Sequence, residues 1–247
     1  MLLYLAAMEA PAFKNLFLLE GQRVPAKGYN YPRYYILDKK RGKMMEFRQS
    51  GFTFKEDLLI VGTSNARGFV RPQVVLPGPT LHSNVHALSI PGATFVHARK
   101  ALPLIPMLVR NVKIVVVIVG ENDIRKGKRA WTIASHAVSL MKEIKALFPK
   151  TKVFLHGILP GLDLDRNKVS AASFLLKRAA KHCSEVFVES PNFPNTEWDK
   201  EDQKHLTASG LLRLWRNVES VIPISPKKQK VFLKKNKAGF IIFFEVA

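Results

Sequence analysis

Cysteine is almost absent from this chain of 247 residues, in which Cys183 has no second thiol to pair with. A single cysteine excludes an internal disulfide and any structural zinc site built from cysteines. Nothing in the sequence therefore requires an oxidising compartment. We expect the protein to be intracellular, either cytoplasmic or nuclear.

Long apolar runs are also absent. No stretch reaches the roughly 18 apolar residues that a transmembrane helix needs, so we expect no membrane span. Residues 1–7 are apolar, but they lack the basic start of a secretory signal, and Glu9 interrupts the segment early. We therefore expect no signal peptide.

Acidic residues are scarce relative to basic ones. The chain has 39 Lys and Arg against 19 Asp and Glu, a net charge of +20 that attracts phosphate polymers and anionic membrane surfaces. Segment 33–48 mixes lysine and arginine with tyrosine and phenylalanine, and segment 227–237 contains six lysines. Both segments are candidates for binding nucleic acid or an anionic surface, although a solvated charged surface is the simpler reading of either one. No zinc finger, RNA-recognition motif or P-loop accompanies them.

The sequence pattern divides the chain into three parts. Residues 1–55 form an irregular segment of basic and aromatic residues without a clear period, and residues 223–247 form a basic tail. Between them, residues 56–222 alternate apolar strands with amphipathic helices, and we find no internal repeat. With 47% hydrophobic residues, a chain of this length can bury one large core.

The pattern of residues 56–222 predicts an α/β fold. The run from Lys113 to Val119 is apolar on both faces, which is typical of a central strand in a parallel sheet. Strands and helices alternate with short connections, so we expect a parallel sheet covered by helices on both faces. The expected strands lie at 58–61, 113–119, 152–155 and 185–188, and the expected helices at 130–147, 168–183 and 208–218.

Polar residues and glycines collect where the predicted strands end. In an open α/β sheet, reactive groups gather beyond the carboxyl ends of the strands. Ser64 follows the strand at 58–61, and Asn122 follows the strand at 113–119. Between these two strands, Gly92 lies in a glycine turn that we take as the end of a further strand. Asp202 and His205 come after the last strand, three residues apart. Together these residues could form a complete hydrolytic site.

These residue types suit acyl transfer. A serine hydroxyl such as that of Ser64 attacks an ester when a base takes its proton, and His205 is the candidate base. Asp202 could accept a hydrogen bond from the other ring nitrogen and stabilise the imidazolium. The N–H of Ser64, the N–H of Gly92 and the side-chain amide of Asn122 are candidate donors to the oxyanion. Taken singly, each residue also has an ordinary structural reading, as a helix cap, a turn glycine or a hydrogen-bonding loop residue.

In order and spacing, these residues resemble the four sequence blocks of the SGNH hydrolases, also called GDSL-type esterases. The first three blocks of the family are similar to Gly62-Thr63-Ser64-Asn65, Ser89-Ile90-Pro91-Gly92 and Gly120-Glu121-Asn122-Asp123. The fourth, an Asp-x-x-His block, is similar to the stretch from Asp202 to His205. The resemblance covers about residues 57–218.

The resemblance implies a three-layer α/β/α sandwich around a five-stranded parallel sheet, in a flavodoxin-like arrangement. It also implies hydrolysis of small O-acyl esters without a metal or other cofactor. The implied triad is Ser64, His205 and Asp202, and the implied oxyanion hole consists of Ser64, Gly92 and Asn122. The acyl group, the alcohol and the oligomeric state stay open.

One position departs from the family pattern, because Thr63 stands where the family usually has an aspartate just before the serine. That aspartate is not part of the triad, so the departure questions activity without excluding it. The alternative is a scaffold that has lost catalysis and binds nucleic acid or an anionic surface. A related esterase domain occurs in proteins of some non-LTR retrotransposons, which would suit so basic a chain.

Overall fold

The structure is a computed structural model. It describes the backbone at residues 16–20, 24–26, 29–31, 33–38, 43–49, 56–70, 83–107, 109, 112–222, 232–235 and 241–244. Side chains are described at residues 58–66, 69, 86–103, 105–106, 109 and 112–222. The side chains of the basic segments 33–48 and 227–237 thus lie outside the described residues. Within the described part of the chain, no helix has the length and apolar character needed to cross a bilayer.

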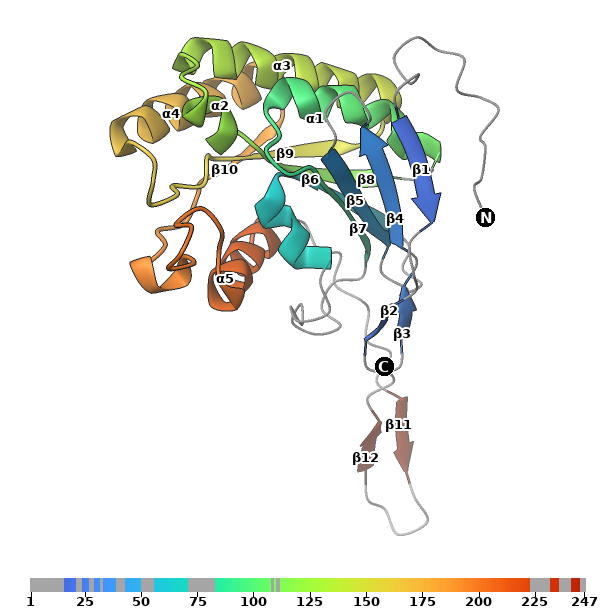
Figure 1. The fold of residues 1–247 in the computed structure, drawn as a ribbon. Helices are drawn as coiled ribbons and strands as arrows, with labels where there is room; N and C mark the ends of the chain where they lie inside the picture. The colour runs from blue at the N-terminus through green and yellow to red at the C-terminus, as the bar shows by residue number, and fades with distance from the viewer. Residues whose placement is uncertain are drawn as a thin grey trace.

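A parallel sheet of five strands forms the centre of the fold (Figure 1). In spatial order, its strands are β7 (Ser83–Ser89), β6 (Glu56–Gly62), β8 (Val112–Ile118), β9 (Lys152–His156) and β10 (Val186–Val188). Every neighbouring pair is parallel. Numbered along the chain, these strands have the order 2-1-3-4-5 of flavodoxin-like folds. The predicted fold class is therefore confirmed.

Helices cover both faces of this sheet (Figure 1). One face carries α1 (Phe95–Ala101), α3 (Ala130–Leu147) and α4 (Arg166–His182), and the other carries the 3-10 helix η2 (Ser64–Val70) and α5 (Ala208–Glu219). The shorter helices η3 (Leu102–Met107), α2 (Glu121–Arg125) and η4 (Asn195–Glu197) lie in connections. The helices and strands predicted from the sequence are confirmed, with ends that differ by at most two residues.

Two apolar cores form because alternate residues of a strand point to opposite faces of the sheet. Val115 and Val117 of β8 pack into the core beneath α1, α3 and α4. Val116 and Ile118 of the same strand pack into the core beneath η2 and α5. Burial on both faces explains why this strand is an almost unbroken apolar run.

The sheet continues beyond β7 into the segment that the sequence pattern left irregular. Three antiparallel strands join it there, so that the whole sheet has eight strands in the order β1-β4-β5-β7-β6-β8-β9-β10. The added strands are β1 (Leu16–Glu20), β4 (Arg33–Asp38) and β5 (Lys43–Gln49). Two separate antiparallel pairs are β2 (Val24–Ala26) with β3 (Tyr29–Tyr31) and β11 (Phe232–Lys235) with β12 (Ile241–Phe244). The division of the chain into domains at residues 56 and 223 stays a prediction.

Candidate active site

β6 ends in a tight turn that presents Ser64. The apolar residues of the strand are completely buried, and η2 begins directly after Gly62 and Thr63. A Cβ atom on Gly62 would lie only 2.4 Å from Cβ of Ala66, so the turn folds back closely and requires a glycine. Ser64 is half-buried at this junction.

The turn that contains Gly92 lies beside this strand end. The N–H of Ile90 donates to the carbonyl of Gly62 at 2.9 Å, and the Ser89 hydroxyl donates to the carbonyl of Thr63 at 3.0 Å. Gly92 has a φ of 66°, in the left-handed region that favours glycine. The nucleophile block and the glycine block therefore meet at the carboxyl edge of the sheet.

Asn122 and Asp123 occupy the first turn of α2, directly after β8. The buried carboxylate of Asp123 accepts hydrogen bonds from the N–H of Phe95 at 3.0 Å and from Nζ of Lys128 at 2.7 Å. The first of these bonds holds α2 against the start of α1, close to the glycine turn. Oδ1 of Asn122 accepts from Nη1 of Arg125 at 3.2 Å, which leaves the amide hydrogens of Asn122 to act as donors elsewhere.

Asp202 and His205 form a hydrogen-bonded pair in the loop before α5. The Asp202 carboxylate accepts from the N–H of Lys204 at 2.9 Å, from the N–H of His205 at 3.0 Å, and from Nδ1 of the His205 ring. Burial opposes ionisation, but these hydrogen bonds lower the pKa of Asp202 to about 2. The carboxylate is therefore charged at neutral pH, and it favours the ring tautomer in which Nε2 is an acceptor.

Asn65 joins this loop to the turn that carries Ser64. Its Nδ2 donates to the carbonyl of Lys204 at 3.1 Å, and its Oδ1 accepts from the N–H of Leu206 at 2.9 Å. These two bonds, which we call the Asn65 clamp, hold the residue after Ser64 against both neighbours of His205. The sequence pattern includes Asn65 in the nucleophile block but carries no sign of this role.

The clamp brings the residue after Ser64 to the backbone on either side of His205, but it does not join Ser64 to His205 directly. Among the described residues, no hydrogen bond joins the Ser64 hydroxyl to the His205 ring. In free enzymes, catalytic hydrogen bonds are often long and shorten when substrate binds. The His205 side chain is 45% exposed, so an incoming molecule can reach it.

A buried carboxyl, that of Glu121, also lies at this edge of the sheet. Burial raises the pKa of Glu121, and the hydrogen bond that it accepts from the Thr63 hydroxyl acts in the opposite direction. Its Oε2 has no hydrogen-bond partner among the described residues. The sequence gives Glu121 no role, because nothing local in the pattern indicates which side chain it meets.

Arg125 links Asn122 to Asp163. Its Nε and Nη2 each donate to the Asp163 carboxylate at 2.8 Å, while Nη1 donates to Asn122. Burial lowers the pKa of Arg125, but the Asp163 carboxylate raises it by a larger net amount, and the hydrogen bonds from Arg125 lower the pKa of Asp163. Both groups are therefore charged at neutral pH. No group of three or more His, Cys, Asp or Glu side chains suited to a metal ion occurs among the described residues.

Comparisons with known proteins identify the fold. No protein-family model and no curated protein matches the sequence. A carbohydrate acetylesterase from Sinorhizobium meliloti is 16% identical, with a TM-score of 0.55 over 67% of this chain and 97% of that one. A lipolytic protein assigned to the G-D-S-L family, from Desulfitobacterium hafniense, is 14% identical, with a TM-score of 0.57 over 68% and 100%. The psychrotrophic esterase EstA from Pseudoalteromonas is 13% identical, with a TM-score of 0.55 over 67% and 96%.

The chain therefore has the fold of the GDSL-type, or SGNH, hydrolases. The resemblance predicted from the four sequence blocks is confirmed at the level of the fold. Because one fold can host several functions, the activity has to be argued from the site residues.

Proposed function

We propose that the protein is a serine hydrolase that cleaves small O-acyl esters. The observation that carries this proposal is the Asn65 clamp, which holds the Ser64 turn against the loop of the His205–Asp202 pair. A nucleophile, a base and an acid that orients the base are the groups that acyl transfer requires. The fold gives further support, since solved structures with this fold include a carbohydrate acetylesterase and an esterase.

In the proposed reaction, Oγ of Ser64 attacks the ester carbonyl while Nε2 of His205 takes the hydroxyl proton. Asp202 accepts from Nδ1 and stabilises the imidazolium. The N–H of Ser64, the N–H of Gly92 and Nδ2 of Asn122 donate to the oxyanion of the tetrahedral intermediate. Collapse of the intermediate expels the alcohol, which receives its proton from His205. The same imidazole then activates water, which hydrolyses the acyl-serine.

The test is hydrolysis of p-nitrophenyl esters of increasing acyl length by the wild type and by Ser64→Ala. We expect Ser64→Ala to lose at least about 10³-fold in kcat/KM, because the covalent route requires the hydroxyl. Ser135→Ala, which changes an exposed serine of α3, is the matched control and should keep full activity. Labelling by a fluorophosphonate should depend on Ser64 in the same way. Equal rates for the wild type and Ser64→Ala at every acyl length would refute the proposal.

The second candidate function is that of a scaffold that binds nucleic acid or an anionic surface, and the net charge of +20 favours it. The basic segments 33–48 and 227–237 would supply the contacts. This function requires affinity for RNA, DNA or anionic vesicles that falls steeply as salt rises. It also requires that Ser64→Ala bind as well as the wild type. Absent or salt-insensitive binding would contradict it.

A further inference from the structure

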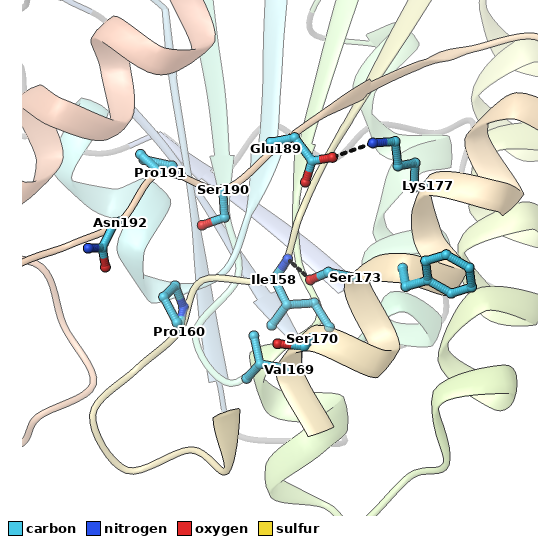
Figure 2. A pocket seen from close by; sticks show the side chains of 11 residues that line it. Ile158, Pro160, Val169, Ser170, Ser173, Lys177, Glu189, Ser190, Pro191 and Asn192 are labelled. Atoms are coloured by element: carbon cyan, nitrogen blue, oxygen red, sulfur yellow. Dashed lines mark hydrogen bonds and ion pairs between the residues drawn. The ribbon is translucent and has the colours of Figure 1, made fainter. Parts of the chain in front are cut away.

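A pocket lies at the carboxyl ends of β9 and β10, beside α4 (Figure 2). Its volume is about 450 Å³, which is within the range of small-molecule sites. Ile158 and Pro160 follow β9, Ser190 and Asn192 follow β10, and Ser173 belongs to α4. Ligands of open α/β sheets bind at this edge, and the proposed hydrolytic mechanism leaves these residues without a role.

The pocket has hydrogen-bonding capacity that the protein does not use. Oγ of Ser190 is buried and has no hydrogen-bond partner within the described ranges. Oγ of Ser173 accepts from the N–H of Ile158 at 3.1 Å, so its own hydrogen remains to be donated. The Asn192 amide adds another donor and acceptor on the lining. Hydroxyl groups of a ligand can pair with all three side chains.

The charged groups of the pocket neutralise each other. Nζ of Lys177 and Oε1 of Glu189 form an ion pair at 2.6 Å, drawn as a dashed line in Figure 2. A carboxylate or phosphate ligand would be recognised by a cation that is not already paired in this way. The lining therefore favours a neutral ligand.

Phe174 of α4 also lines the pocket and gives it an exposed aromatic surface. Its side chain is 60% exposed, although large hydrophobic residues are otherwise mostly buried in the described part of the chain. The face of an aromatic ring is negatively polarised and attracts positively polarised C–H groups. A sugar ring presents such C–H groups on one face and hydroxyls around its edge, whereas an acyl chain would leave the polar lining unsatisfied.

We propose that this pocket binds a neutral sugar residue. The loop after Pro160 connects the pocket to the candidate active site, because the N–H of Leu162 donates to the carbonyl of Gln203 at 3.0 Å. Asp163 of the same loop pairs with Arg125. The sugar is therefore assigned as the alcohol part of the ester substrate. This assignment rests on the proposed esterase function, whereas sugar binding itself does not.

Binding is tested on the full chain carrying Ser64→Ala, with the methyl glycosides of glucose, galactose, mannose and xylose, by saturation-transfer NMR and titration. We expect at least one glycoside to bind and Phe174→Ala to weaken its Kd about tenfold. Trp131→Ala removes another aromatic side chain that is 61% exposed but lies outside the pocket lining, so it is the matched control and should leave Kd unchanged. Absence of binding at about 50 mM of every glycoside, far above a millimolar Kd, would overturn the proposal. Equal Kd values for the two variants would overturn it as well.

Hydrolysis then tests where the sugar lies relative to the ester. For the acetylated form of the bound glycoside, Phe174→Ala should raise KM about tenfold while KM for p-nitrophenyl acetate stays unchanged. An equal rise with p-nitrophenyl octanoate would assign the pocket to the acyl chain and overturn the sugar assignment. Sugar binding without any esterase activity would refute the proposed function alone. Esterase activity without sugar binding would refute the pocket proposal alone.

Discussion

Thr63 donates a side-chain hydrogen bond to the buried carboxyl of Glu121, across the ends of the neighbouring strands β6 and β8. The two side chains are 0% and 2% exposed, respectively. The SGNH pattern usually has an aspartate at the position of Thr63. In this chain a carboxyl still lies next to the strand end, but it comes from α2, the short helix that follows the neighbouring strand β8. The replacement of the family's aspartate by Thr63 therefore does not leave this end of β6 without a carboxyl group.

The Thr63–Glu121 contact predicts that Thr63→Asp alone is harmful and that a second change relieves it. Two carboxyls would then meet in a buried site, so we expect the free energy of unfolding to fall by about 3 kcal/mol. Adding Glu121→Thr restores one acid and one hydroxyl, and the double variant should recover about half of the loss or more. Urea unfolding of the wild type, both single variants and the double variant measures this coupling. Strictly additive effects of the two changes would contradict the contact.

Burial of Glu121 predicts an unusual pH dependence of stability. The ordinary pKa of this side chain is 4.5, and burial raises it in the native state. The unfolded chain therefore loses this proton at a lower pH than the native protein does, so the wild type loses stability as pH rises from 4.5 through the raised pKa. The side chain in Glu121→Gln cannot titrate. Relative to the wild type, the free energy of unfolding of this variant should therefore rise by at least about 1 kcal/mol between pH 4.5 and pH 8.

Guanidinium unfolding at several pH values within this interval measures the difference between Glu121→Gln and the wild type. Glu201→Gln, which changes an exposed glutamate, is the matched control and should follow the wild type throughout. If the curves for Glu121→Gln and the wild type stayed parallel, Glu121 would not titrate with a raised pKa.

The Asn65 clamp predicts a loss of rate that exceeds any loss of substrate binding. Asn65→Ala removes two hydrogen bonds to the backbone around His205, which should lower the free energy of unfolding by about 2 kcal/mol. Displacement of the imidazole from Ser64 should lower kcat for p-nitrophenyl acetate about 10²-fold, while KM stays nearly constant. Stopped assays at saturating and limiting substrate separate the two constants.

Asn195→Ala, which changes an exposed asparagine of η4, controls for the loss of an amide and should match the wild type in both kcat and stability. Asn65→Asp keeps an acceptor for the N–H of Leu206 but replaces the donor to the carbonyl of Lys204. It should therefore fall between the wild type and Asn65→Ala. An unchanged kcat in Asn65→Ala would show that the clamp does not position the base.

The predictable parts of the fold are those in which burial imposes a regular pattern. β8 lies between two helical layers and is apolar in both directions, and α3 repeats buried residues at helical spacing because one face packs on the sheet. The sequence marks β7 only by the turn that follows it, because this strand contains the buried polar residues His86 and Ser89. A buried polar residue interrupts the apolar pattern, so periodicity does not detect such a strand.

In the candidate site, too, local sequence features could be predicted, whereas contacts between distant segments could not. Each block is short and contiguous, so Ser64 and His205 could be identified as candidate site residues from the sequence. The contacts between blocks could not, because Asn65 and Leu206 are 141 residues apart and Thr63 and Glu121 are 58 apart. Which of these side chains meet depends on strand order and register, and hydrophobic periodicity specifies neither.

Arg125 makes a set of hydrogen bonds that a lysine cannot reproduce. Three of its nitrogens are engaged, two with the Asp163 carboxylate and one with Oδ1 of Asn122. Because the last bond engages Oδ1, the amide hydrogens of Asn122 are left to donate, and in the proposed mechanism they donate to the oxyanion. Arg125→Lys keeps the charge but loses the planar fork, so Asn122 is no longer held in one orientation.

We expect Arg125→Lys to lower kcat/KM for p-nitrophenyl acetate about tenfold, less than the roughly 10²–10³-fold expected when an oxyanion donor is removed outright. Asn122→Ala supplies that upper limit. Arg129→Lys changes an exposed arginine just after the same helix, and it should leave the rate unchanged. If the effect of Arg125→Lys equals that of Arg129→Lys, the guanidinium does not orient Asn122. If it equals that of Asn122→Ala, Arg125 acts on the oxyanion itself, because loss of orientation alone leaves part of the donor in place.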